Sequence, residues 1–286
     1  MERKTLERVI YEKDADLGVA RIILNYPEKA NVQDSRLAWD VDECLAEADR
    51  DYDVKVVILK ANGRGFCAGH AIFAGEQEDV YPDFFHSMQA TGNTWKGQLD
   101  LFVTPVLRLW EFPKPTIAQV HGYCVGGGTY FGLLTDMTVA SDDAYFQMPL
   151  VQGLGLPGGE TMIEPYVFMN WKRAAEYLYT ARTLSAQEAL EYGLVNRVVP
   201  RDELEATVEE LAAKTAKAPL STLMATKALL KRAWEQMGMR MLMQMSNDLL
   251  IVAGVSSDVA RLREERGRAR PREWAASKTD LSANDD

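Results

Sequence analysis

The chain has 286 residues, is 47% hydrophobic and carries a formal net charge of −10. It can bury the core of one large domain, with or without an appendage, and its acidity gives nucleic-acid binding no electrostatic support. Three cysteines without CxxC or His-rich spacing predict neither a disulfide framework nor a metal site. No apolar run reaches membrane-spanning length and the first residues lack an apolar signal core, so a cytoplasmic protein is expected.

The first third of the chain predicts a β–α–β arrangement. Two strands are expected at 9–11 and 19–24, and a third at 54–60, where the sequence reads VKVVILK. Between them Asp34 or Ser35 can cap a helix. Its apolar residues recur at helical spacing: Leu37, Val41, Leu45 and Ala48. This order favours parallel strands covered by helices.

Residues 71–95 are rich in aromatic and acidic side chains and have no regular period. Their aromatic residues either line an apolar pocket or pack beneath a long loop: Phe73, Tyr81, Phe84, Phe85 and Trp95. His86 is expected to be structural. A helix is predicted from 95 to 112, with Pro105 kinking or interrupting it.

The segment from Lys114 to Asp136, KPTIAQVHGYCVGGGTYFGLLTD, organises the chain. A buried strand is predicted at 116–120, then three glycines, then a buried helix. The first N–H groups of a helix lack intrahelical partners, and glycine lets a ligand approach them. The pattern therefore suits a phosphate or an oxyanion, or simply tight helix–strand packing. It is neither a Walker A loop nor a convincing dinucleotide fingerprint.

The remaining elements follow in order. Strands are expected at 137–141 and 195–199, helices at 171–179 and 185–192, and a Gly/Pro-rich loop typical of an active site at 146–161. Ser185 and Glu188 fit a capping box. Residues from 201 onward read as helical. Alternate methionines there fit packing, an adaptable interface or an acyl pocket: Met237, Met239, Met241, Met243 and Met245.

Four stretches together resemble the crotonase superfamily, also called the enoyl-CoA hydratase/isomerase family. They are LNYPEKAN at 24–31, GFCAG at 65–69, HGYCVGGG at 121–128 and TARTLSAQEALEYGLVNRVVP at 180–200. The resemblance runs in order from about residue 9 to about residue 262. It implies an α/β crotonase (ClpP-like) fold, in which repeated ββα units form a spiral core. We expect the core domain at 1–200, a C-terminal helical region at 201–265 and a flexible tail at 266–286.

The resemblance also implies a device for binding acyl-CoA thioesters. Two backbone N–H groups would polarise the thioester carbonyl and stabilise an enolate, and by position these are Ala68 and Gly127. CoA, which is part of the substrate and not a separate cofactor, would contact Lys29 and Ala30. On the second loop it would contact a further run of residues: Gly69, His70, Ala71 and Ile72. A homotrimer or homohexamer is expected, with no nucleic-acid or membrane partner.

The acid–base residues depart from the family pattern. Hydratases of the family use two glutamates, and here Tyr130 and Leu150 stand at those positions. Leucine transfers no proton, and a tyrosine with a pKa near 10 is a poor base. Cys67 and Cys124 lie in the two predicted loops, where small core-lining residues are the simpler explanation.

Four residues are candidates for the roles of the missing glutamates. Glu160, in PGGET, is either catalytic or an acid in the first turn of the next helix, and Glu164 is the weaker candidate one turn later. The family usually has AGxD where this chain has Ala68-Gly69-His70-Ala71, so the aspartate is absent. The AGH sequence partly resembles the methylmalonyl-CoA decarboxylase branch, which retains AGHD. There the histidine helps to bind an acyl carboxylate, whereas a loop hydrogen bond is the structural alternative. Tyr130 could still hold a water.

These observations predict an enzyme that acts on an acyl-CoA through a stabilised enolate. A decarboxylase or isomerase is the first alternative, because it needs fewer proton-transfer groups than hydration. A CoA-thioester-binding protein without efficient turnover is the second.

Overall fold

A seven-stranded sheet forms the centre of the computed structural model, which describes residues 1–71, 94–159 and 161–267. The first three strands are antiparallel, and every later pair is parallel. The strand order is β1 (Glu2–Thr5), β2 (Val9–Asp14), β3 (Val19–Leu24), β4 (Val56–Ala61), β5 (Thr116–Val120), β7 (Met137–Ser141) and β10 (Arg197–Val199). The sequence predicted all of these strands except β1, an exposed and charged edge strand.

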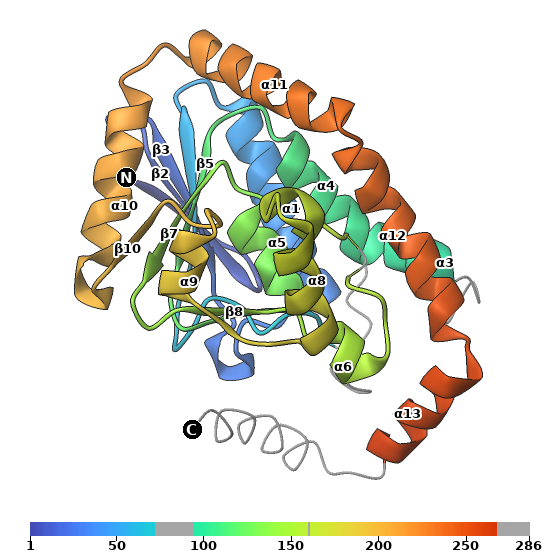
Figure 1. Ribbon diagram of the computed structural model, residues 1–286. Coiled ribbons are helices and arrows are strands. Elements are labelled where there is room, and N and C mark those ends of the chain that lie inside the picture. The colour runs from blue at the N-terminus through green and yellow to red at the C-terminus, as the bar shows by residue number, and fades with distance from the viewer. Residues whose placement is uncertain (72–93, 160, 268–286) are drawn as a thin grey trace.

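The middle strands carry apolar residues on both faces because helices cover both sides of the sheet. All residues of β3 and β5 are buried. On one face Val19, Ile58 and Ile117 pack against α10 (Leu204–Ala216). The larger core lies on the other face, beneath α1 (Ser35–Arg50), α4 (Thr104–Glu111) and α5 (Gly127–Leu133). Figure 1 shows α10 separated from these three helices by the sheet.

Local signals account for where several helices begin. The Asp34 side chain accepts a hydrogen bond from the N–H of Leu37 at 2.8 Å and caps α1. Ser185 and Glu188 form the predicted capping box of α9 (Ala186–Glu191).

The remaining helices on the core are α6 (Leu150–Leu154), α7 (Glu164–Val167) and α8 (Trp171–Thr180), with short 3-10 turns at Pro27–Lys29 and Arg201–Glu203.

The predicted interruption at Pro105 takes a milder form. Helix α3 (Thr94–Gln98) continues through a π-helical turn (Leu99–Val103) into α4, with Pro105 in the first turn of α4. The N–H of Thr104 bonds the carbonyl of Leu99, five residues back. The wider turn accommodates a residue that has no N–H to donate.

A small second sheet supports the glycine-rich segment. It has the order β6 (Tyr123–Val125), β8 (Tyr145–Gln147) and β9 (Leu184–Ser185). The N–H of Gly126 donates to the carbonyl of Gln147 at 2.8 Å, which ties the start of α5 to β8. The helix after the glycines is thereby fixed at the end of two strands.

Polar contacts tie the C-terminal helices to the sheet. Arg21 in β3 pairs with Glu209 in α10 at 2.6 Å, and Lys60 in β4 with Glu205 at 2.7 Å. Helices α11 (Leu220–Gln236), α12 (Met239–Gly254) and α13 (Ser257–Gly267) then pass along the outside of the molecule (Figure 1). Among the described residues, no helix is long and apolar enough to cross a membrane.

Candidate active site

Two loops meet beside the start of α5. Cys67 and Cys124 form a parallel bridge, and the N–H of Val125 donates to the carbonyl of Cys67 at 2.9 Å. The loop after β4 and the loop after β5 therefore run side by side. This confirms that the two glycine-rich segments lie together.

The approach of the two loops requires glycine at Gly69. A Cβ atom there would lie 3.2 Å from the nitrogen of Gly127 and 2.7 Å from the carbonyl oxygen of Val125. Gly69 also has a φ of 92°, which side chains disfavour. Any other residue at position 69 would push the loops apart.

The structure corrects the predicted role of Ala68. Its N–H donates to the carbonyl oxygen of Ala30 at 3.1 Å, so this group is engaged within the protein. Ala30 itself has a φ of 55° and follows the Pro27–Lys29 turn. The Lys29–Ala30 segment therefore lies against the Ala68 loop and holds its backbone.

The buried side chain of Asn31 holds the segment around Lys29 and Ala30 to the loop that contains Ala68. Its side chain is fully buried, accepts from the N–H of Tyr26 at 2.8 Å and donates to the carbonyl of Asn62 at 2.8 Å. The same amide lies 3.2 Å from the carbonyls of Gly65 and Phe66. One buried amide therefore locks the first loop, and the family resemblance did not single it out.

His70 follows the glycine that touches Gly127. In the parallel bridge between Gln33 and His70, the carbonyl of Gly69 and the N–H of Ala71 face Gln33, at 2.8 and 3.0 Å. Because the C=O of Gly69 and the N–H of His70 belong to one trans peptide and point in opposite directions, the N–H of His70 points away from Gln33. The imidazole packs edge-on to Phe102, with ring centroids 4.3 Å apart.

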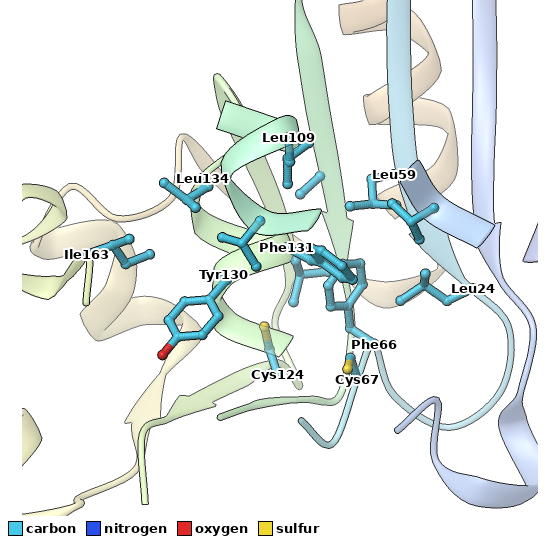
Figure 2. Close-up of a cluster of buried hydrophobic side chains, with 14 of the residues drawn as sticks. Leu24, Leu59, Phe66, Cys67, Leu109, Cys124, Tyr130, Phe131, Leu134 and Ile163 are labelled. Carbon is cyan, nitrogen blue, oxygen red and sulfur yellow. The ribbon is translucent and has the colours of Figure 1, made fainter. Parts of the chain in front are cut away.

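Tyr130 occupies the position of the first family glutamate, on α5. The residue is 1% exposed, and its hydroxyl lies against Gly159 in the Gly/Pro-rich loop. Figure 2 shows its ring on the other side of Cys124 from Phe66, with the hydroxyl pointing away from the other labelled side chains. Leu150, at the second glutamate position, begins α6 and packs against the main core.

Glu164 is a buried carboxyl group at the start of α7. It is 3% exposed, and one of its oxygens accepts from the N–H of Ile163 at 3.0 Å. Burial raises its pKa to about 7. Its charge also raises the pKa of the neighbouring Tyr177 hydroxyl, although burial of that hydroxyl contributes more. Glu164 is therefore a group that titrates near neutrality, which its sequence position alone did not reveal.

The cysteines of the two loops are core residues. Cys67 and Cys124 are both fully buried. Burial raises the pKa of Cys67 to about 12 and that of Cys124 well above its usual value. Neither thiol forms a thiolate at neutral pH, which agrees with the expected packing role.

Several sequence predictions lie outside the described residues. These are the candidate Glu160, the CoA-contact residue Ile72, the structural assignment of His86, and the aromatic residues Phe73, Tyr81, Phe84 and Phe85. Trp95 is described: it is 43% exposed, and its indole N–H donates to Asp248 on α12.

Fold and paired loops together define a protein of the crotonase superfamily. A model of the enoyl-CoA hydratase/isomerase family matches residues 14–252, and the chain belongs to this family.

Individual relatives agree with this assignment. The chain is 30% identical over 247 residues to the putative enoyl-CoA hydratase EchA13 of Mycobacterium tuberculosis, covering 82% of this chain and 77% of the relative. It is 33% identical over 199 residues to a (7aS)-7a-methyl-1,5-dioxo-2,3,5,6,7,7a-hexahydro-1H-indene-carboxyl-CoA hydrolase of Rhodococcus jostii, covering 70% and 71%. An enoyl-CoA hydratase/isomerase structure from Xanthobacter autotrophicus superposes with a TM-score of 0.82 at 30% identity, covering 95% and 97%.

Proposed function

We propose that this chain binds an acyl-CoA thioester with its carbonyl oxygen between the backbone N–H groups of Gly127 and His70. One observation carries the proposal: the contact of Gly69 with Gly127, which brings the two loops to one point. Gly127 is the first residue of α5, so its N–H has no acceptor within the helix. His70 takes the place of Ala68 because the Ala68 N–H is bonded to Ala30.

This pair of donors favours reactions that pass through an enolate. When an α-proton or a carboxylate leaves the acyl chain, charge moves onto the thioester oxygen, where two fixed N–H groups stabilise it. CoA would extend from this point along the Lys29–Ala30 segment and the Gly69–Ala71 loop.

Isomerisation or decarboxylation fits the site better than hydration. Tyr130 is buried against Gly159, and Leu150 offers no polar group, so two described positions that would hold and activate water lack carboxylates. The relatives carry more than one activity in their names, among them the Rhodococcus carboxyl-CoA hydrolase. Binding without efficient turnover is the remaining alternative.

A panel of acyl-CoA substrates in deuterated water, followed by mass spectrometry, tests the proposal. Deuterium at the α-carbon without mass gain from water indicates enolate formation. A gain of water indicates hydration, and a loss of CO₂ indicates decarboxylation. A ligand-bound crystal structure with the thioester oxygen away from Gly127 and His70 would overturn the binding mode.

We also propose a homotrimer or homohexamer. The C-terminal helices expose many large apolar side chains, which a second copy of the chain would cover. They are Leu229, Leu230, Met237, Met241, Met245, Leu249 and Val252. The alternate methionines separate accordingly, since Met239 and Met243 are buried in the core and the others are exposed.

A further inference from the structure

Gln33 lies between the two loops of the candidate site and bonds to both. The residue is 2% exposed and follows the buried Asn31 junction. Its backbone accepts from the N–H of Ala71 at 3.0 Å and donates to the carbonyl of Gly69 at 2.8 Å. Its main chain therefore holds the first loop on both sides of His70.

The side chain of Gln33 reaches the second loop. Its Nε2 donates to the carbonyl oxygen of Gly127 at 3.1 Å, across 94 positions of sequence. Its Oε1 and the Nε2 of His70 each lie 2.2 Å from the point that a Cβ on Gly127 would occupy. The two atoms are therefore no further apart than twice that distance, so amide and imidazole sit together over Gly127.

The contact bears on the peptide group that carries the Gly127 N–H. The N–H of Gly126, just before this peptide, is bonded to Gln147, and the carbonyl of Gly127, just after it, is bonded to Gln33. Within this peptide the carbonyl of Gly126 accepts from the N–H and the hydroxyl of Thr129, at 2.9 and 2.7 Å, so its direction within α5 is fixed. Gln33 in turn ties the start of α5 to the His70 loop. Without the amide donor of Gln33, the start of α5 would lose its side-chain link to the His70 loop, and the spacing between the two backbone N–H groups would change.

We propose that Gln33 is a positioning residue: its carboxamide sets the position of the Gly127 N–H relative to the His70 loop. This inference rests on the proposed function, since it concerns how the two donors are aligned on a thioester oxygen. A misaligned donor still permits CoA binding, but it polarises the carbonyl less. Gln33 acts through Gly127 and does not itself transfer a proton.

The test compares Gln33→Met with the wild-type chain. Methionine has nearly the length and volume of glutamine and cannot donate to Gly127. Butanoyl-CoA labelled with ¹³C at the thioester carbonyl is the probe, and infrared spectroscopy measures how far its carbonyl stretch falls on binding. The same complex in deuterated water gives the rate of α-proton exchange. Affinity for free CoA and thermal unfolding are measured alongside.

Gln119→Met is the matched control. Gln119 is also buried, at 6% exposure, but it lies on β5 and its Oε1 has no hydrogen-bond partner among the described residues. By strand alternation its side chain shares the sheet face of Ile117, which packs toward α10 and away from the loops. The same chemical change is therefore made outside the site.

For Gln33→Met we expect a smaller carbonyl shift and α-proton exchange slower by about ten- to hundredfold, with free-CoA affinity within about twofold. Gln119→Met should retain the full shift and rate. Gln33→Leu, which also removes the donor, should give the same result if the methionine variant folds poorly. If the wild-type chain polarises the thioester and both Gln33 variants do so equally, the inference is wrong and the proposed function stands. If the wild-type chain produces no carbonyl shift, both are overturned.

Discussion

The hydroxyl of Tyr130 lies so close to Gly159 that a Cβ atom on the glycine would be 1.3 Å from the hydroxyl oxygen. Tyr130 belongs to α5, and Gly159 to the Gly/Pro-rich loop after α6. A tyrosine at the position of the family's first glutamate is therefore accommodated by a residue without a side chain 29 positions later. The Tyr130 hydroxyl thus occupies the space that a side chain at position 159 would need.

This contact predicts strong coupling between substitutions at the two positions. Gly159→Ala should destabilise the chain by about 1–3 kcal/mol, because the added methyl group must displace a buried phenol. In a Tyr130→Leu background the same substitution should cost much less. Urea unfolding of the four variants of a double-mutant cycle measures the interaction. Additive free energies of unfolding would show that the two positions are not coupled, contrary to this prediction.

Hydration of crotonyl-CoA should be slow. Each missing general acid–base group typically removes about 10²–10⁴-fold in rate, and neither Tyr130 nor Leu150 replaces one readily. The assay compares this chain with a family member that has both glutamates, at equal thioester saturation. A rate typical of that relative would show that the interpretation of positions 130 and 150 is wrong.

Residual activity should depend on Glu160, a carboxylate in the Gly/Pro-rich segment at 146–161 of the sequence. We expect Glu160→Gln to abolish α-proton exchange or turnover while CoA affinity is retained. Gln152→Glu on α6 is compared with Glu160→Gln, because it adds a carboxylate and leaves Glu160 in place. If Glu160→Gln leaves the rate unchanged, Tyr130 and His70 become the groups to test.

Glu164 should make stability fall as pH rises. The folded chain keeps this proton up to a pKa of about 7, whereas the ordinary value is 4.5, so the folded state binds more protons between the two values. The stabilisation is complete below about pH 4.5 and is lost as pH rises through about 7, with an upper limit of about 3 kcal/mol. Unfolding by urea from pH 4.5 to pH 8 should show a steeper loss in the wild-type chain than in Glu164→Gln.

Asp40 also contributes to the pH dependence of stability. Burial raises its pKa to about 6, so it adds a loss of the same sign to both chains. The difference between the wild-type chain and Glu164→Gln removes this contribution. Parallel pH profiles for the two proteins would contradict a raised pKa at Glu164.

Lys227 should contribute strongly to the attachment of α11. Its buried ammonium group donates to the carbonyl of Lys114 at 2.9 Å and pairs with Asp136 at 2.7 Å, and burial lowers its pKa. Lys227→Met should cost about 2–4 kcal/mol, because Asp136 loses its cation and the carbonyl its donor. The exposed Lys214→Met should change stability by less than about 0.5 kcal/mol. A similar small effect of Lys227→Met would contradict this role.

The oligomer is tested by mass in solution. If a second copy covers the exposed leucines and methionines of α11 and α12, light scattering at micromolar concentration should give three or six chains. Met241→Lys and Leu249→Lys, each placing a charge on this face, should lower that mass. A monomeric wild-type chain would overturn the proposal.

The sequence by itself determined the features that depend on near neighbours. The buried runs of β3, β5 and β7, the Asp34 cap and the Ser185 capping box each arise from residues a few positions apart. A local period or a local hydrogen bond is enough to specify them. The glycine run after β5 likewise predicted a loop where backbone N–H groups are accessible, and the motifs predicted the family.

Tertiary structure decided the contacts between distant segments. Ala68 and His70 are two residues apart in one loop, and only the bond from Ala68 to Ala30 shows that the Ala68 N–H is engaged. The Gln33 side chain bonds to Gly127, which is 94 positions away in the sequence. The Tyr130 hydroxyl lies against Gly159, and no periodic pattern in the sequence relates the two. The burial that raises the pKa of Glu164 also arises only in the folded chain. Such properties depend on how the elements pack, and a linear pattern carries no record of which distant atoms will lie within a few ångströms.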